Sequence, residues 1–482
     1  MIGGAIFDNL HWKTIVMFRS LVVLCAIAML LTVDLSAAER PNVVVLFSDD
    51  QRADTIHALG NDLIRTPNLD RLVREGAAFT QAHIMGGLQP AVCVPSRAMM
   101  LSGKSLFRVS EKLQSETLMP QAFATAGYET FGTGKWHNGA PAYVRAFAAG
   151  DKVFLGGMSD QSKVPWRSLT QLQATPLPKP TVGDQFSSEM FTDAAVTFLK
   201  QKHDRPFFCY VAFTSPHDPR TPPGEYATMY DPAKVPLPPN FAPVHLFNNG
   251  EMQVRDELLA PWPRTPEVVR QHLADYYGMI SHLDAQVGRV LKTLEETGQL
   301  KNTIIVFAGD NGLAIGSHGL FGKQNLYEHS VGVPLLIAGP GVKSGHRTAA
   351  MCYLFDVFPT LCDLAGITAP SEVEGRSLAA AAAGNKESHR NQLFFAYRDV
   401  QRGVRDRQYK LIRYPKINKS QLFDLDKDPH ETTDLAYVPD QAERLTEMTR
   451  FLERSQREWG DDLPLITDPP QPFRIELKSR AK

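Results

Sequence analysis

The chain has 482 residues, and its 51 basic and 52 acidic side chains give a net charge of −1. Proteins that bind nucleic acid through bulk charge are usually strongly basic, so this balance argues against a nucleic-acid partner. With 43% hydrophobic and 21% charged residues, the composition is that of a globular protein and argues against disorder or a coiled coil. The 34 prolines accompany no periodic repeat, so we expect long ordered loops.

The N-terminus has the features of a secretory signal peptide. Its thirteen-residue apolar run, Leu21–Val33, is shorter than the ~20 residues that a membrane-spanning helix needs. Lys13 and Arg19 precede the run, and Ser36-Ala37-Ala38 follows it with small side chains. We therefore expect a signal peptide over residues 1–38 and a mature chain that is periplasmic or secreted, without a membrane span. Met17 would be a neater start, which would make residues 1–16 a gene-start artefact.

Apolar runs and helical patterns alternate along the mature chain. Runs that are apolar throughout, such as Val43–Phe47, are typical of parallel strands that helices cover on both faces. Apolar residues spaced by three and four predict a long helix from Gln271 to Leu300. Thr66-Pro67 and Gly76 predict the cap, start and end of a shorter helix. The alternation predicts an α/β fold with a large, mostly parallel sheet sandwiched by helices. The other predicted parallel strands are Tyr128–Gly132, Phe207–Phe213, Thr303–Phe307 and Val333–Ala338.

The character of the sequence changes near residue 395. Before it, residues 216–266 contain twelve prolines and little periodicity, and so long a loop in a compact domain is often functional. After it, shorter strands and an amphipathic helix follow one another. We therefore expect a large α/β domain at residues 39–394 and a smaller C-terminal α+β subdomain with a short antiparallel sheet at residues 395–482. The elements predicted near and within the subdomain are Leu393–Tyr397, Gly403–Val404, Tyr409–Tyr414 and Asp440–Trp459.

Oxygen-bearing side chains directly follow two of the predicted strands. Asp49 and Asp50 follow the first strand, and Asp310 and Asn311 follow the strand Thr303–Phe307. Ligands of open α/β sheets bind beyond the carboxyl ends of the strands, so we expect these residues to meet. Either pair alone is explained better as turn or cap chemistry, but both pairs together favour a metal site. Oxygen ligands alone suit Ca²⁺ or Mg²⁺ rather than Zn²⁺.

Basic side chains follow the remaining strand ends. Lys135 and His137 come after one predicted strand, and His217 comes after another. Lys323 lies in a glycine-punctuated loop, twelve residues past Asn311. Each of these residues alone is explained as an ordinary surface residue. Together they predict an electropositive pocket around the metal that suits a tetrahedral anion.

The segment from Cys93 to Lys104, CVPSRAMMLSGK, matches the pattern C-x-P-S-R-x-x-x-L-[ST]-G-[RK] at every fixed position. This pattern is the sulfatase signature, and the chain resembles a type I formylglycine-dependent sulfatase of the alkaline-phosphatase-like superfamily, which includes arylsulfatases and carbohydrate sulfatases. The resemblance runs from about Pro41 to beyond Leu435. Local physics agrees with it. Pro95 suits the first helical position, which would place Cys93 just before a helix N-terminus that favours an anion.

The resemblance implies a modified nucleophile and a metal ion. In this family a maturation enzyme oxidises the signature cysteine, here Cys93, to formylglycine. The hydrated aldehyde attacks sulfur and then expels sulfate by re-forming the aldehyde. Asp310 would help to deprotonate the attacking hydroxyl. One Ca²⁺ per chain would be bound by Asp49, Asp50, Cys93 in its modified form, Asp310 and Asn311.

The resemblance also implies acid–base and anion-binding roles. Arg97 would hold the formylglycine hydroxyls. Lys135 and Lys323 would bind sulfate oxygens and offset the developing charge, a type of stabilisation that often dominates catalysis. His217, assisted by Lys323, would protonate the leaving oxygen, and His137 would deprotonate the second hydroxyl to release sulfate.

Other residues are weaker candidates for contact with the substrate. Asp218 and Arg220 are candidates for binding a sugar hydroxyl or carboxylate, although an internal salt bridge explains them at least as well. His318 and Glu328 fall in family-like positions and are interpreted as structural support. Cys209 is expected to be a buried thiol, and Cys352 and Cys362 are left open as a pair. The remaining candidates for the mouth of the pocket are Trp166, Trp262, Gly156–Met158, Arg398, Arg402 and Arg405.

Three functions fit this pattern. The first is an exported sulfatase that acts on a sulfated carbohydrate or a related ester. The second is a phosphate or phosphonate ester hydrolase of the same superfamily, although such an enzyme more often uses an unmodified Thr or Ser and two metals. The third is a non-catalytic binder of sulfated glycans in which Cys93 stays a thiol.

Overall fold

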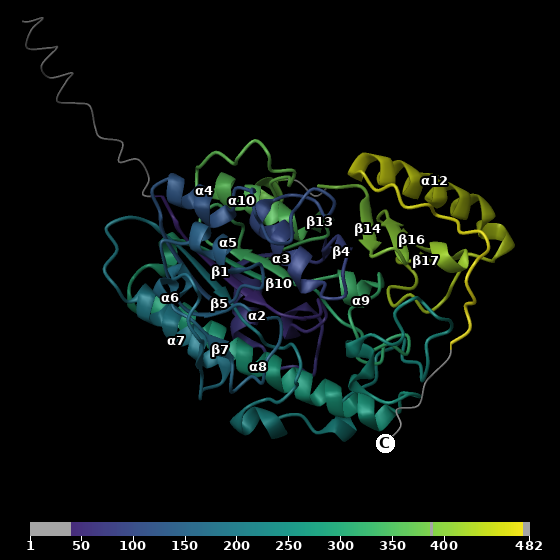
Figure 1. Cartoon of the computed structure of the whole chain (residues 1–482), viewed down its shortest axis with the longest axis horizontal. Helices are drawn as coiled ribbons and strands as arrows, with labels where there is room; N and C mark the ends of the chain where they lie inside the picture. Colours follow the sequence, from purple (N-terminus) through teal and green to yellow (C-terminus); the bar gives the residue numbers. More distant parts are fainter. Residues whose placement is uncertain (1–39, 386–388, 476–482) are drawn as a thin grey trace, which may run out of the picture. The chain divides into compact units, whose positions relative to one another are not determined.

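A mixed sheet of eight strands forms the centre of the fold. The computed structural model describes residues 40–385 and 389–475, so the predicted signal peptide of residues 1–38 lies outside the described residues. The strands are β1 (Asn42–Ser48), β2 (Gly76–Phe79), β5 (Glu129–Lys135), β6 (Ala149–Phe154), β9 (Phe207–Ala212), β10 (Thr303–Gly309), β11 (Leu335–Ala338) and β12 (His346–Thr348). They lie in the order β12-β2-β11-β10-β1-β9-β5-β6 (Figure 1).

Strands β10, β1, β9, β5 and β6 run parallel to one another, as their uninterrupted apolar runs predict. Strand β11 is antiparallel to both of its neighbours, β10 and β2. The prediction that Val333–Ala338 forms a parallel strand was therefore wrong. Burial on both faces makes a strand apolar throughout whichever way it runs, so the run itself carries no direction. The sheet is still mostly parallel, and the predicted α/β fold is confirmed.

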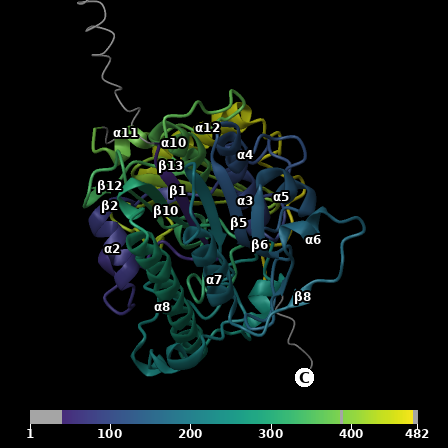
Figure 2. The ribbon, with the colours of Figure 1, turned by 90° about the vertical axis from the view of Figure 1, so that its left-hand side faces the viewer.

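Helices cover both faces of this sheet. The helices are α2 (Pro67–Glu75), α3 (Cys93–Ser102), α4 (Met119–Thr125), α5 (Ala140–Ala146), α7 (Ser187–Leu199), α8 (Pro266–Glu296) and α10 (Val357–Leu364). In β1, Val43 and Val45 pack in one core with α3, α4, α5 and α10, whereas Val44 and Leu46 pack in another with α2, α7 and α8. The two groups of helices lie on opposite sides of the sheet (Figure 2). Because successive strand residues face opposite ways, a doubly covered strand must be apolar at every position.

Two predicted helices form with small differences at their ends. Helix α8 starts at Pro266, five residues before the predicted stripe, and the Thr265 hydroxyl accepts a hydrogen bond from the Val268 amide. Helix α2 starts at Pro67 and ends before Gly76, as predicted. Thr66 does not cap α2, because its hydroxyl accepts instead from the amide of His57, at 2.9 Å.

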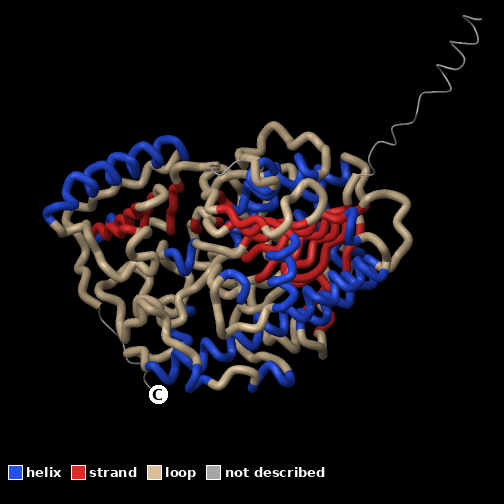
Figure 3. Tube along the Cα trace, turned by 180° about the vertical axis from the view of Figure 1, so that it is seen from behind, coloured by secondary structure: helices blue, strands red, loops and turns tan. Residues whose placement is uncertain are grey.

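A second sheet lies towards the C-terminal end of the chain. It contains β4 (Gly86–Gly87), β14 (Leu393–Tyr397), β15 (Gln401–Arg405), β16 (Tyr409–Tyr414) and β17 (Lys419–Asp424), in the order β17-β16-β15-β14-β4. Strands β14 to β17 are antiparallel. The helix α12 (Ala442–Trp459) packs on β15 and β16, and Figure 3 shows this sheet as a group of strands separate from the large one.

One strand of the second sheet, β4, comes from a part of the sequence far from its other strands. Strand β4 pairs in parallel with β14 across some three hundred residues of sequence. Gly86 has φ 112°, and a Cβ atom there would lie 2.0 Å from the carbonyl oxygen of Ala396, so only glycine permits this approach. The described residues from Pro41 onward belong to one compact unit. The domain boundary at residue 394 stays a prediction.

The remaining elements are short. They are β3 (Ala82–His83), β7 (Pro165–Trp166), β8 (Thr181–Val182), β13 (Cys352–Tyr353), α6 (Leu169–Gln173), α9 (Glu328–Val331) and α11 (Ala379–Ala382). The proline-rich segment 216–266 contains three short 3₁₀ helices, at Gly224–Thr228, Pro232–Lys234 and Arg255–Leu259. The cysteines among the described residues, Cys93, Cys209, Cys352 and Cys362, are all buried free thiols. None of the described helices is long and apolar enough to cross a membrane.

Candidate active site

The parallel strands bring the predicted site residues to one edge of the sheet. Asp49 and Asp310 follow β1 and β10, which are neighbours in register up to Ser48 and Gly309. Backbone hydrogen bonds fix this edge, because the Asp310 amide donates to the Ser48 carbonyl at 3.1 Å and the Asp49 amide to the Ser215 carbonyl at 3.0 Å. The topology thus places the chain segments that carry the acids next to the one that carries His217.

Cys93 lies at the first residue of α3 rather than before the helix. The expectation that the helix begins near Pro95 was wrong by two residues, because a proline is tolerated anywhere in the first turn, where amides have no intrahelical partner. The Cys93 Sγ atom lies 3.4 Å from Nδ1 of His137 and 3.7 Å from Nζ of Lys135. Burial raises the pKa of the Cys93 thiol above its ordinary value. An unmodified Cys93 is therefore a poor thiolate nucleophile.

Arg97 ties the two strand ends together from within α3. Its guanidinium is fully buried, and Nε and Nη2 lie 2.9 Å and 2.8 Å from Oδ2 of Asp310. Nη1 donates to the carbonyl of Lys135 at 3.0 Å. Burial and the nearby Asp49 carboxylate raise the pKa of Asp310 to about 6 despite the arginine. The Asp49 and Asp310 carboxylates repel each other, and the single positive charge of Arg97 does not neutralise both.

Each lysine of the predicted pocket pairs with one carboxylate. Lys135 Nζ donates to Oδ2 of Asp49, and Lys323 Nζ donates to Oδ1 of Asp50, both at 2.5 Å. Burial alone would raise the pKa of Asp50, but the opposing charges of His217 and Lys323 hold it well below its usual range. Asn311 Nδ2 also donates to Oδ1 of Asp50, at 2.8 Å. Asp50 is thus a carboxylate throughout the neutral pH range.

The acidic residues fit a hard cation. Among the described residues, two groups have potential ligand atoms within 4.8 Å of one another, namely Asp49 with Asp50 and His217, and Asp49 with Cys93 and Asp310. The buried oxygens Asp49 Oδ1 and Asn311 Oδ1 have no hydrogen-bond partner. A buried oxygen without a partner is costly unless something else binds it. Three carboxylates and an amide oxygen are the donors that Ca²⁺ prefers.

The two histidines of the site differ in their surroundings. His217 is buried, its Nε2 lies 3.5 Å from Oδ2 of Asp50, and its Nδ1 lies 2.8 Å from the carbonyl oxygen of Asp218. Burial lowers the pKa of His217. Burial and the charge of Lys135 lower the pKa of His137 to about 2, so His137 is a neutral imidazole at neutral pH.

These residues open into a cavity of about 240 Å³. Three of its polar wall residues were missed by sequence reasoning: Arg255, Asp256 and Gln324. Arg255 pairs with both Asp218 and Asp256, and Gln324 donates to Asp256 at 2.8 Å. Arg255 and Asp256 lie in a 3₁₀ helix of the proline-rich loop, where no periodicity marks them. The cavity is lined by Pro90, Ala91, Cys93, His137, Gly157, Met158, His217, Val254, Arg255, Asp256, Lys323 and Gln324.

Several weaker candidates do not line this cavity. Arg402 forms a buried two-armed ion pair with Asp461, at 2.6 Å and 2.9 Å, and Arg405 pairs with Glu328 at 2.7 Å. Both were candidates for the mouth of the catalytic cavity, but neither lines it. The other candidates that lie outside the lining are Gly156, Trp166, Arg220, Trp262 and Arg398, whereas Gly157 and Met158 belong to it.

Asp218 and Arg220 do not pair with each other. The partner of Asp218 is Arg255, as an internal salt bridge, and Arg220 Nη1 contacts Nδ1 of His272 at 3.1 Å. Trp166 lies beneath the ammonium group of Lys152, at 3.3 Å from the ring centre. These groups are therefore held by neighbours in the fold.

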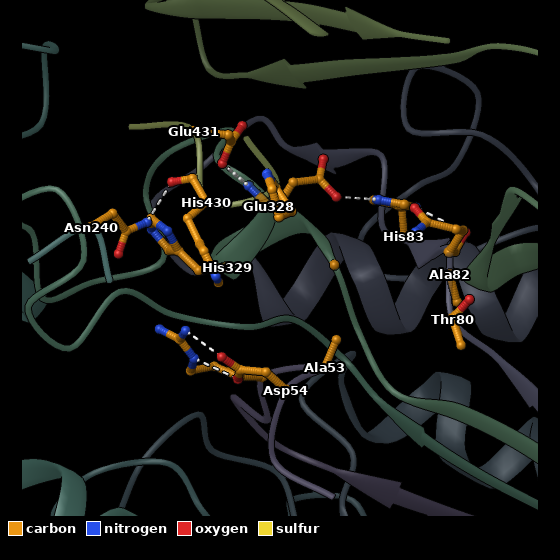
Figure 4. A pocket seen from close by; sticks show the side chains of 14 residues that line it. Ala53, Asp54, Thr80, Ala82, His83, Asn240, Glu328, His329, His430 and Glu431 are labelled. Atoms are coloured by element: carbon orange, nitrogen blue, oxygen red, sulfur yellow. Dashed lines mark hydrogen bonds and ion pairs between the residues drawn. The ribbon is translucent and has the colours of Figure 1, made fainter. Parts of the chain in front are cut away.

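Glu328 is the centre of a charge cluster that lies outside the lining of the catalytic cavity. It pairs with His83 and Lys410, each at 2.9 Å, and with Arg405 at 2.7 Å. Figure 4 shows Glu328 and His83 joined to each other in the wall of a pocket that Arg52 and Asp54 also line. This cluster joins β3 to the second sheet. His318 stacks on Tyr327, with ring centres 3.9 Å apart.

Comparisons with known proteins agree with the geometry. The sulfatase family model matches residues 41–367, and a model described as N-sulphoglucosamine sulphohydrolase, C-terminal, matches residues 316–458. The N-acetylglucosamine-6-O-sulfatase of Bacteroides thetaiotaomicron is 25% identical over 507 aligned residues, which cover 88% of each chain.

Solved structures share the fold at lower identity. One, a complex with its substrate D-glucosamine-2-N,6-O-disulfate, has a TM-score of 0.75 at 24% identity and covers 89% of this chain and 99% of its own. The phosphonate monoester hydrolase of Agrobacterium radiobacter has a TM-score of 0.69 at 22% identity and covers 87% and 96%. Since the sulfatase model matches more than half of the chain, the protein belongs to the sulfatase family and is a sulfuric ester hydrolase.

Proposed function

We propose that the chain is an exported sulfatase that removes sulfate from a sulfated carbohydrate, using formylglycine made from Cys93 and one bound Ca²⁺. The observation that carries the proposal is the position of Cys93. Its Sγ lies at the N-terminus of α3, beside Lys135 and His137 and within 4.8 Å of ligand atoms of Asp49 and Asp310. A helix N-terminus, a lysine and a cation all favour a bound anion.

The protein's own side chains suit the transfer of a sulfuryl group. Calcium would supply positive charge at a sulfate oxygen, and formylglycine would supply a hydroxyl nucleophile. Lys135 and Lys323, which contact Asp49 and Asp50, bind the remaining sulfate oxygens, so that their charges oppose the charge that develops during bond breaking. Arg97 holds Asp310 in place beside the nucleophile.

Two histidines move the protons. His217 lines the cavity with Nε2 available, and from there it protonates the leaving oxygen of the ester. His137 Nδ1 lies 3.4 Å from Sγ of Cys93, within reach of the group attached at residue 93, and it accepts the proton of that group.

The cavity wall supports a sugar as the alcohol part of the ester. Arg255 and Asp256 present charged groups, and Gln324 presents an amide, all of which form hydrogen bonds with hydroxyl groups. Met158 is 48% exposed and offers an apolar surface to a sugar ring. The names of the relatives, among them an N-acetylglucosamine-6-O-sulfatase, point to the same class of substrate.

Initial rates on nitrophenyl sulfate, nitrophenyl phosphate and a phosphonate monoester test the reaction class. The purified mature enzyme should prefer the sulfate to the phosphate, because one calcium ion and two lysines suit a singly charged ester better than a dianion. A clear preference for the phosphate or phosphonate would instead assign the chain to the hydrolases that share its fold. Binding of sulfated glycans with no release from any ester would identify a non-catalytic binder.

A further inference from the structure

A second cavity, of about 450 Å³, lies apart from the catalytic one and shares none of its lining residues. It is formed where the edge strand β12 of the large sheet meets the end of β15 and the segment that follows β17 in the small sheet. Its lining consists of Gln81, His346, Arg347, Thr348, Ala349, Met351, Arg405, Arg407 and Asp426.

Basic side chains dominate this cavity. Arg347 and Arg407 are exposed, and Asp426 is the one acidic residue in the lining. Within the described residues, Arg407 forms no hydrogen bond or ion pair, and Arg347 bonds only to the carbonyl oxygen of Ala58. Two arginines without a carboxylate partner leave positive charge facing the cavity. In a chain with a net charge of −1, this local excess does not follow from the overall composition.

A third arginine forms a fixed part of the lining. Arg405 is 3% exposed, and its Nη1 is held by Glu328 at 2.7 Å and contacts His83 Nε2 at 3.0 Å. Its Nε donates to the carbonyl of Asp406 at 3.2 Å. Within the described part of the chain, the other terminal nitrogen, Nη2, has no partner and is not sealed from solvent. The guanidinium is thus held in one orientation with a free donor, the arrangement that a sulfate group requires.

The size of the cavity indicates more than a single ion. A volume of about 450 Å³ far exceeds that of one sulfate, and the arginines come from different elements around the lining. Gln81 and Thr348 add groups that form hydrogen bonds with hydroxyls, and Met351 adds an apolar surface. Anionic groups spaced along a hydroxyl-rich chain match this set of side chains.

We propose that this cavity is a second binding site for sulfated oligosaccharides, which holds a segment of the glycan that the catalytic cavity does not contact. This inference rests on the proposed function, because the ligand is of the same class as the substrate. Arg405 provides the fixed contact, while Arg347 and Arg407 bind further sulfate groups. The site increases the affinity for long sulfated chains and has no effect on small aryl sulfates.

The test compares two double variants of the full mature chain. Arg347→Ala with Arg407→Ala removes two exposed charges from the cavity lining. Arg454→Ala with Arg457→Ala removes the same charge from exposed positions on α12 that lie outside the lining. Calorimetry with a heparin tetrasaccharide is carried out in the Cys93→Ala background, so that no sulfate is released during the titration. Chitotetraose serves as the neutral probe, and inorganic sulfate as the simple anion.

We expect the Arg347/Arg407 variant to bind the tetrasaccharide roughly tenfold more weakly at this cavity, with the binding at the catalytic cavity unchanged. The Arg454/Arg457 variant should keep both sites. Equal affinity in the two variants, or equal losses, would overturn the proposal, since equal losses would reflect net charge alone. Inorganic sulfate that displaces the tetrasaccharide from this site at the same concentration would show a simple ion site and overturn the glycan assignment.

A separate readout keeps this inference distinct from the proposed function. In chains with an intact Cys93, the turnover of nitrophenyl sulfate should be the same in wild type and in the Arg347/Arg407 variant. If wild type hydrolyses no ester, the proposed function fails whatever the calorimetry shows. If wild type is active and the tetrasaccharide binds at one site only, the second site alone is wrong.

Discussion

Replacement of His217 by alanine should harm the hydrolysis of sugar sulfates far more than that of aryl sulfates. His217 Nδ1 lies 2.8 Å from the carbonyl oxygen of Asp218, and a carbonyl only accepts, so Nδ1 carries a hydrogen. A proton for the substrate must therefore be carried on Nε2, in the imidazolium form that the Asp50 carboxylate, 3.5 Å from Nε2, favours against the effect of burial. Without His217, a departing sugar alkoxide finds no donor at this point.

The size of the effect follows from the stability of the leaving group. General acid catalysis contributes about 10²–10⁴-fold, or roughly 3–5 kcal/mol of barrier, when the leaving oxygen is strongly basic. Nitrophenolate is stable without a proton, so its loss should stay below about tenfold. The assay measures kcat/KM for nitrophenyl sulfate and for the best sugar sulfate. The control variant is His57→Ala, which removes an exposed histidine. Equal losses on both substrates would refute the assignment of His217 as the acid.

Three further changes test the packing around the site. Arg97→Met leaves the buried Asp310 without its arginine partner. In urea titrations, the free energy of unfolding should fall by about 3–5 kcal/mol when a chelator is present. The loss should be smaller when calcium is present. Gly157→Ala places a Cβ within 2.7 Å of His137 Nε2 and displaces the imidazole ring, so kcat should fall. Met158→Ala is the control, because it leaves that ring undisturbed. An unchanged kcat in Gly157→Ala would show that the ring moves freely. Burial alone would raise the pKa of Asp356, but Arg390 lowers it to about 2. This ion pair therefore stabilises the fold above pH 4 by about 2 kcal/mol, and the contribution is lost as pH falls towards 2. Urea titrations should show that the free energy of unfolding falls less steeply with decreasing pH in Asp356→Asn than in wild type. An equal pH dependence in the two proteins would contradict this.

The catalytic edge of the sheet was predictable from sequence because two signals coincide there. Strands covered on both faces are apolar throughout, so β1 and β10 are visible as uninterrupted runs. Polar residues placed directly after such runs must lie at the carboxyl edge, which locates Asp49 and Asp310 without knowledge of the strand order. The signature around Cys93 then identifies the chemistry.

Features that depend on distant contacts were not predictable. The direction of β11 is set by its place between β10 and β2, and its apolar residues would be the same either way. Two glycines at Gly86–Gly87 give no strand pattern, yet they form β4 by close approach to β14. Arg255 reaches the cavity through a loop without periodicity, and its pairing with Asp218 joins residues 37 positions apart.

Mass spectrometry combined with sulfate release tests the central claim most directly. The peptide that contains Cys93 should carry the mass of formylglycine in chains purified from the native host, and sulfate release should increase in proportion to the modified fraction. Removal of calcium should abolish that release, and added calcium should restore it. Full turnover by chains with an intact thiol at residue 93, or undiminished turnover without calcium, would contradict the account.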